Sequence, residues 1–253
     1  MPLGDIAQYD SKALHLDVLL KLFGVLDLHS HIRWWAIKEY IDKMNKNADI
    51  GAGWGIMSFE FVKATSKSID CVEVDPKLIQ LGRTLAAKLG TRKIRFIRDS
   101  LPKLSKLKRN YYDQILLIDV LEHVKEDLES LIRINSLLRR EGILIISVPT
   151  PNYPKYFGQR FANAIGHVRE GYTIKDVEKL LKMTGFEIIK WSYHTNFLSP
   201  YLCKLWYNCT LSSKLKIILF PFLRTLGRLD FIGKGINSCG IAIKARKVSD
   251  IIE

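Results

Sequence analysis

The chain has 253 residues, which is long enough for one sizeable α/β domain with an accessory layer. Hydrophobic residues make up 47% of the chain and charged residues 26%, which excludes a disordered or fibrous protein. The formal net charge of +13 indicates either an anionic partner, such as nucleic acid, a membrane surface or a phosphorylated substrate, or a solvated basic face.

The cysteines and the apolar segments bear on where the protein acts. The four cysteines form no CxxC pair, which favours a reducing compartment and argues against a structural zinc. The start, "MPLGDIAQYDSK", lacks the apolar stretch of a signal peptide. The most apolar block, 217–223, is far shorter than the roughly 20 residues that span a bilayer. We therefore expect a cytoplasmic protein.

The first part of the chain predicts helices followed by a sheet. Helical patterns over 11–23 and 31–44 predict a helical cap within residues 1–45. From residue 46 onward, short β-branched runs alternate with helical patterns, which is typical of a parallel sheet wrapped by helices. We expect the main domain to cover 46–253, with early strands directly before Gly51 and over 68–74, 93–97 and 113–118.

Start and stop residues mark the helices between the strands. Asp75 as N-cap and Pro76 at the first helical position begin one helix, which Gly90 ends. An apolar stripe predicts a second helix over 125–142 that ends at Gly142. A strand over 143–148, an aromatic-rich rim loop over 149–161, a helix from Thr173 with Asp176 as capping-box partner and Gly185 as terminator, and strands over 185–193 and 239–247 follow.

Three glycines at alternate positions, Gly51, Gly53 and Gly55, stand where the first strand turns into a helix. Glycine there lets a ligand approach the backbone without meeting a β-carbon. The spacing is GxGxG, and Ile56 stands where the dinucleotide pattern GxGxxG has its last small residue, which argues against NAD. No GKS or GKT follows, so a P-loop is excluded.

Acidic residues follow the early strands. Glu73 lies 22 residues beyond Gly51, near the end of the second strand, where an acid can take both hydroxyls of a ribose. Asp99 comes just past the third strand, where a carboxylate could accept a hydrogen bond from an adenine amino group, and Asp49 precedes the first glycine. The simpler interpretation of Glu73 is a solvated acid at a strand end, and that of Asp75 is a helix cap alone.

The motifs "ADIGAGWG", "CVEVDPKLI", "FIRDS" and "YDQILLIDVLEHV", in that order, resemble those of class I S-adenosylmethionine-dependent methyltransferases, type 11 group. The resemblance covers about residues 46–191 and the last strand. It implies an α/β, Rossmann-like, doubly wound sheet of seven strands, mostly parallel with an antiparallel last strand, plus N-terminal helices and an inserted helical segment over 196–238.

The resemblance also implies S-adenosylmethionine as cofactor and gives roles to particular residues. The methionine part would meet the glycine turn, the ribose Glu73, and the adenine Asp99 between apolar walls. Asp119, at the end of the fourth strand, would lie beside the methionine end, or would cap the helix that follows. Trp54 could be core packing. The implied cofactor-binding residues are Asp49, Gly51, Gly53, Gly55, Glu73, Val74, Asp99, Ser100, Leu101 and Asp119.

Two histidines are candidates for a catalytic base if the acceptor is a hydroxyl, because a neutral imidazole can take its proton. His123 follows the fourth strand, and His167 precedes the helix at Thr173. Their structural alternatives are a hydrogen bond at a helix start and the anchoring of a loop. Asp119, Glu122 and His123 also resemble the trio that some quinone-pathway O-methyltransferases use for a divalent ion, but spacing alone assigns no metal here.

The insertion 196–238 holds six Lys or Arg and one acid among apolar and aromatic residues. This mixture is typical of an amphipathic element lying on a membrane surface, and it suggests a lipid-linked acceptor and peripheral membrane contact. The alternative is a lid that packs its apolar side on the core. We expect O-methylation of a small-molecule, sugar or lipid-linked acceptor, with the oligomeric state left open.

Two further hypotheses compete with this function. The first is an RNA methyltransferase, because nine basic residues face one acid between 88 and 109. Against nucleic acid, the fourth strand ends in "IDVLEHV" and not in the Asn/Asp-Pro-Pro-Tyr run that stacks a flipped base. The second is a non-catalytic or NAD-binding protein of the same fold, which a shift in melting temperature with S-adenosylhomocysteine but not with NAD would exclude.

Overall fold

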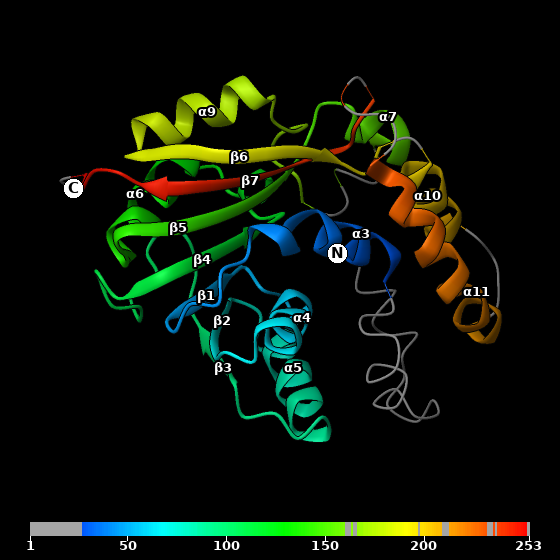
Figure 1. The fold of residues 1–253 in the computed structure, drawn as a ribbon, viewed down its shortest axis with the longest axis horizontal. Coiled ribbons are helices and arrows are strands. Elements are labelled where there is room, and N and C mark those ends of the chain that lie inside the picture. The colour runs from blue at the N-terminus through cyan, green and yellow to red at the C-terminus, as the bar shows by residue number, and fades with distance from the viewer. Residues whose placement is uncertain are drawn as a thin grey trace.

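The protein forms a seven-stranded sheet with helices on both faces (Figure 1). The computed structural model describes residues 27–159, 163, 166–196, 198–208, 213–231, 235 and 237–251, so the helix expected over 11–23 lies outside it. The strands are β1 (Asn47–Ile50), β2 (Ile69–Glu73), β3 (Ile94–Arg98), β4 (Tyr112–Ile118), β5 (Leu138–Pro149), β6 (Phe186–His194) and β7 (Gly240–Lys247).

The strand order is β3-β2-β1-β4-β5-β7-β6. Strands β1 to β5 pair in parallel, whereas β7 runs antiparallel to both of its neighbours, β5 and β6. This confirms the predicted sheet. The order reverses between β1 and β4, and in such sheets the carboxyl ends of the strands at the reversal form the ligand crevice.

Two apolar cores, one on each face, hold the helices to the sheet. On one face Leu131 and Val177 pack with Leu144 of β5, and on the other Trp34 and Phe61 pack with Ile145 of the same strand. The helices of these faces are α6 (Asp127–Leu137) and α9 (Ile174–Met183) on the first, and α3 (Leu28–Ile37), α4 (Ile56–Thr65) and α5 (Pro76–Lys88) on the second.

The helix expected over 31–44 begins earlier and ends sooner than predicted. Asp27 caps it, with its side chain accepting from Ser30 N at 2.7 Å, and after Ile37 only the short η1 (Lys38–Tyr40) continues. Asp42 is held by Gln114 and by Lys244 at 2.7 Å. These tertiary contacts fix an extended backbone where local sequence favours a helix.

The helix expected over 125–142 was also predicted too long, because α6 ends at Leu137. The buried ammonium of Lys247 accounts for the difference: it donates to Asn135 O at 2.8 Å and to Leu138 O at 2.9 Å. Leu138 already pairs with Tyr112 in the sheet. Gly142 therefore lies within β5, in a bend so tight that a β-carbon would approach Arg139 O to 2.8 Å.

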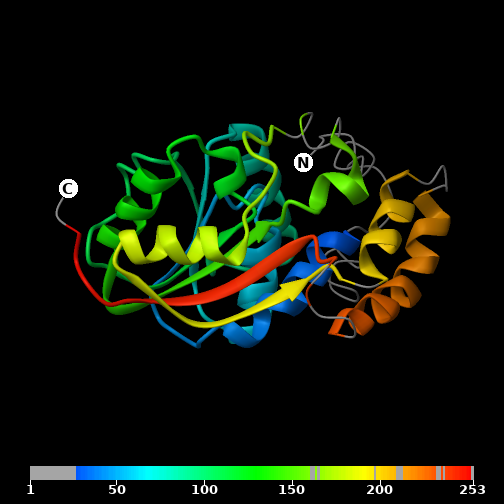
Figure 2. The same ribbon diagram turned by 90° about the horizontal axis from the view of Figure 1, so that it is seen from above.

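The insertion is helical, as predicted. It contains α10 (Ser199–Asn208), α11 (Ser213–Gly227) and η3 (Arg228–Phe231), and it contacts α3 and the short α7 (Tyr153–Phe157). Both views show α10 and α11 side by side at one end of the molecule, beyond the sheet (Figures 1 and 2). The sequence 149–161, expected to be an irregular loop, includes α7.

Candidate active site

The glycine turn joins β1 to α4, and its three positions require glycine for different structural reasons. All have positive φ, at 70°, 59° and 94° for Gly51, Gly53 and Gly55. A β-carbon on Gly51 would lie 2.5 Å from Val120 Cγ2, whereas one on Gly53 would meet nothing within 4 Å. Gly53 therefore forms the open edge of the turn, and Gly51 allows it to pack closely on the segment after β4.

Asp49 and Glu73 are the buried acids of this turn. Asp49 accepts from Ser58 Oγ at 2.8 Å, and burial raises its pKa to about 7. Glu73 Oε2 accepts from Gly53 N at 2.9 Å, and its Oε1 accepts from Val74 N and Asp75 N. Both acids therefore lie against the glycine turn, and Glu73 is not the solvated strand-end acid of the simpler interpretation.

The residues expected around adenine lie at the ends of β2 and β3. Asp99 N donates to Glu73 O at 3.1 Å, which brings the two acidic residues together. Asp99 Oδ1 and Oδ2 accept from Ser100 N and Lys106 N, so this carboxylate also shapes its own loop. Val74 is 57% exposed, Ser100 is exposed, and Leu101 packs in part on the core.

Two smaller expectations are settled by hydrogen bonds and packing. Asp75 caps α5 by accepting from Lys77 N at 2.8 Å, as the simpler interpretation had it. Trp54 packs against the core of its face beside Phe59, with 6.4 Å between ring centroids. Neither side chain is needed to explain cofactor binding.

Asp119 is part of a buried polar network that the sequence did not reveal. With φ at 52°, it forms an ion pair with Arg33 Nη1 at 2.9 Å and accepts from Ser147 Oγ at 2.6 Å. Neither contact caps the helical turn η2 (Leu121–His123), so the cap hypothesis for Asp119 is wrong. Ser147 Oγ also lies 3.1 Å from His194 Nε2, which links β4, β5, β6 and α3.

The protons in this network can be placed by elimination. A carboxylate only accepts, so the Ser147 hydroxyl donates to Asp119 and takes its second bond from His194 Nε2–H. Burial lowers the pKa of His194 to about 4, so the ring is neutral, and its Nδ1 accepts from Thr195 Oγ1 at 3.0 Å. Only the polar Ser147 within a buried strand could have suggested this network from sequence.

His123 and His167 come together beside Glu122. The two rings form an edge contact with centroids 4.9 Å apart. His123 Nδ1 lies 3.2 Å from Gly166 O, and because a carbonyl only accepts, Nδ1 carries the proton. Nε2, 3.9 Å from Glu122 Oε1, is then the nitrogen that can act as a base or ligand. His167 Nδ1 is buried without a hydrogen-bond partner, and burial lowers its pKa to about 4.

Glu122 completes this group. Its side chain is buried, Oε2 has no hydrogen-bond partner, and burial together with the charge of Asp119 raises its pKa well above the usual value. One ligand atom each from Glu122, His123 and His167 lies within 4.8 Å of the others, which is close enough to hold a cation. Asp119, expected in such a trio, is instead paired with Arg33.

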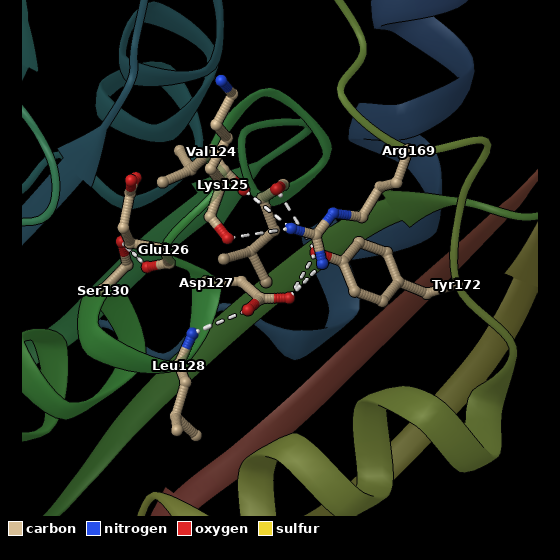
Figure 3. Close-up of polar contacts among 9 residues, drawn as sticks. Val124, Lys125, Glu126, Asp127, Leu128, Ser130, Arg169 and Tyr172 are labelled. Carbon is tan, nitrogen blue, oxygen red and sulfur yellow. Dashed lines mark hydrogen bonds and ion pairs between the residues drawn. The ribbon is translucent and has the colours of Figure 1, made fainter.

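A separate set of bonds fixes the segment that carries His167 (Figure 3). The Arg169 guanidinium forms an ion pair with Asp127, donates to Val124 O at 2.9 Å, and lies beside Tyr172, whose hydroxyl also reaches Asp127. Val168 N donates to Glu122 O at 2.8 Å. Since these bonds anchor the segment, His167 is not required as the anchor.

Aromatic rings extend from His167 toward the N-terminal helix. The Tyr153 ring lies 5.3 Å from that of His167 and stacks at 4.5 Å on Phe157, which in turn stacks on His29 of α3 at 5.5 Å. Helix α7 supplies two of these rings. We call Tyr153, Phe157 and His29 the aromatic wall. The aromatic composition of the 149–161 stretch indicated that rings would gather here, but not how they stack.

Comparisons with known proteins agree with this geometry. Residues 48–144 match the family model described as a methyltransferase domain. No curated protein matches the chain. Solved structures with the same fold include S-adenosylmethionine-dependent methyltransferases from Archaeoglobus fulgidus (17% identity, 92% of this chain and 100% of that one, TM-score 0.60), Mesorhizobium loti (17%, 87% and 99%, 0.60) and Methanosarcina mazei (18%, 84% and 96%, 0.57).

At these identities the structures establish a shared fold. Together with the domain match, the fold and the glycine turn with its two acids define a class I S-adenosylmethionine-dependent methyltransferase domain, which confirms the resemblance seen in the sequence. Residues 48–144 are therefore a methyltransferase domain, and its cofactor is S-adenosylmethionine. The domain match favours this class over the NAD-binding and non-catalytic alternatives.

Proposed function

We propose that the enzyme methylates a hydroxyl group of a small-molecule, sugar or lipid-linked acceptor, with His167 as general base. The observation that carries this proposal is the state of the His167 ring, which is neutral and has a buried nitrogen with no hydrogen-bond partner. An unpartnered buried nitrogen is costly unless a ligand completes it. In the tautomer with its proton on Nε2, Nδ1 would accept a hydrogen bond from an acceptor hydroxyl, and the same bond would prepare that proton for transfer.

The charges around His167 act on this proton transfer in both directions. When bound, S-adenosylmethionine supplies a sulfonium methyl group that is already activated for displacement. As the new O–C bond forms and the S–C bond breaks, the hydroxyl proton passes to His167. Asp119 favours the protonated form of this ring, whereas burial and His123 oppose it. His123, through Nε2, is the second candidate for the base.

The ten residues that the resemblance assigned would hold the cofactor. The turn fits such a group, because Gly53 faces open space and the three glycines, at alternate positions, all have positive φ. Glu73 accepts two backbone N–H bonds on Oε1 and one on Oε2, so one lone-pair site, on Oε2, remains for a ribose hydroxyl. Burial raises the pKa of Asp49 to about 7, and an ammonium group at the methionine end would favour its ionised form.

The stacked rings of α7 favour an acceptor with an apolar or flat portion. Tyr153 and Phe157 lie between His167 and His29, so an acceptor that reaches His167 would pass along them. Aromatic faces bind apolar chains and rings well, and they exclude water from the transfer step. This supports a lipid-linked or ring-containing acceptor over a small charged one.

Two matched variants test the proposal. His167→Asn should bind S-adenosylhomocysteine as the wild type does but lose methyl transfer by about 10²–10⁴-fold, the usual contribution of a general base. Asp49→Asn should instead weaken cofactor binding. Candidate hydroxyl, amine and thiol acceptors incubated with labelled cofactor would be analysed by mass spectrometry. Methylation of an amine or thiol alone, or full activity of His167→Asn, would refute the proposal.

RNA is the alternative acceptor class. The basic 88–109 stretch runs from the end of α5 through the edge strand β3 into the loop before β4. Within it, Arg95 pairs with Asp70, and Lys93 and Lys106 donate to backbone carbonyls. These local contacts explain part of the positive charge without a nucleic acid. RNA binding that weakens steeply with added salt would favour this alternative.

A further inference from the structure

The inserted helices carry apolar side chains on two opposite faces. On α11, Phe220 and Leu223 are buried with Leu28 and Ile32 of α3. On its other face, Ile218 is 71% exposed and Phe222 62% exposed. The inner face fully accounts for how α11 is held to the protein, and the outer face needs a separate explanation.

Helix α10 repeats this arrangement. Leu202 and Trp206 are buried in the same cluster, while Tyr201 and Leu205 are 59% and 50% exposed. Of the twelve exposed large hydrophobic residues in the described part of the chain, six lie in the insertion. We call the five that lie on α10 and α11 the outer face: Tyr201, Leu205, Leu215, Ile218 and Phe222.

The charged residues within α10 and α11 have one sign. Neither α10 nor α11 contains an Asp or Glu, and Lys204 is exposed between Tyr201 and Leu205. The single acid of the insertion, Asp230, is held by the backbone N–H of Asn196 at 2.6 Å. Among the described side chains, α10 and α11 therefore present apolar groups and the Lys204 cation, without a compensating acid from either helix.

We propose that the outer face of α10 and α11 docks onto an anionic lipid bilayer. Apolar side chains on a helix lying in the interface enter the acyl boundary, while lysines meet lipid phosphates. A second copy of the chain would bring cations against cations in a symmetric contact, so charge disfavours self-association. Within the described residues, no helix is both long and apolar enough to cross a membrane.

The test is flotation of the full chain with lipid vesicles at low salt. We expect binding to phosphatidylcholine vesicles that contain phosphatidylglycerol, and little binding to phosphatidylcholine alone. The variant I218S/F222S should lose about thirtyfold or more in vesicle affinity, from the apolar groups removed. Lys204→Gln should lose about fivefold, the effect of one lysine near an anionic surface.

Matched control variants distinguish vesicle binding through the outer face from binding through other exposed apolar side chains or other basic residues. M183S/I189S removes side chains that are 52% and 49% exposed on α9 and β6, and should bind vesicles as the wild type does. Lys103→Gln, in the basic 88–109 stretch, should also have no effect. Equal losses in the controls, or full binding by I218S/F222S, would overturn the proposal.

Two further measurements keep this proposal distinct from the proposed function. S-adenosylhomocysteine affinity and circular dichroism of I218S/F222S should match the wild type, because both side chains are exposed. Light scattering during gel filtration would show whether the wild type is a dimer that I218S/F222S dissociates. That result, without vesicle binding, would assign the outer face to a second copy and refute membrane docking.

Discussion

Asp49 should make the stability of the free protein depend on pH in the direction opposite to most carboxyl groups. Its side chain is 1% exposed, and burial raises its pKa from 3.8 to about 7. Because the folded pKa exceeds the unfolded value, this group's contribution is fully present below about pH 4 and is lost as the pH rises through about 7. The shift corresponds to about 4 kcal/mol lost by about pH 8.

Asp49→Asn isolates this effect, since asparagine stays neutral and still offers an oxygen to Ser58 Oγ. We expect the variant to be more stable than the wild type at pH 8, by an amount that shrinks by about 2–3 kcal/mol at pH 5. Urea unfolding followed by circular dichroism at both pH values measures this, with the helix-cap variant Asp75→Asn as control. A difference that does not change with pH would refute the reasoning.

Three other outcomes follow from the site. Gly51→Ala should lower the free energy of unfolding by about 3 kcal/mol or more, because it adds a clash with Val120 to an unfavourable φ, whereas Gly53→Ala should cost only about 1–2 kcal/mol; equal urea midpoints would contradict this packing role. With His167 as base, kcat/KM should fall as the pH drops through about 4 and level off above it, and a rate that keeps rising to high pH would point to unassisted ionisation of the acceptor. Activity should persist in EDTA, and a loss restored by one divalent metal would assign Glu122, His123 and His167 to that ion instead.

The sheet was predictable because its signals are local. Asp75, Pro76 and the Thr173–Asp176 capping box begin helices where the structure has them, and the glycine turn falls directly after β1. The two errors in helix length have the same kind of cause. Lys247 and Gln114 reach the chain from distant strands, so the contacts that end α6 and extend the backbone at Asp42 have no local signature.

The cofactor side of the site was also more predictable than the acceptor side. Asp49, Glu73 and the glycines belong to one continuous turn and the adjoining strand, so spacing locates them together. The acceptor side joins His167 to Tyr153 of α7, and Asp119 to Arg33 of α3. These partners lie far apart in the sequence, and their meeting depends on how the N-terminal helix packs over the sheet.

The insertion connects the two proposals. Thr195, directly before the insertion, is bonded to His194, and Asn196, its first residue, is bonded to Asp230. The segment that carries the outer face therefore continues directly from the buried network at Asp119. Helix α10 also contacts α7, with the Tyr156 and Tyr201 rings 5.7 Å apart. A bilayer on the outer face would therefore lie next to the aromatic wall that leads to His167. If the acceptor is lipid-linked, I218S/F222S should raise the KM for acceptor in vesicles and leave unchanged both kcat and the KM for a detergent-dispersed acceptor. If the variant and the wild type have the same KM in vesicles, docking on the outer face does not contribute to catalysis.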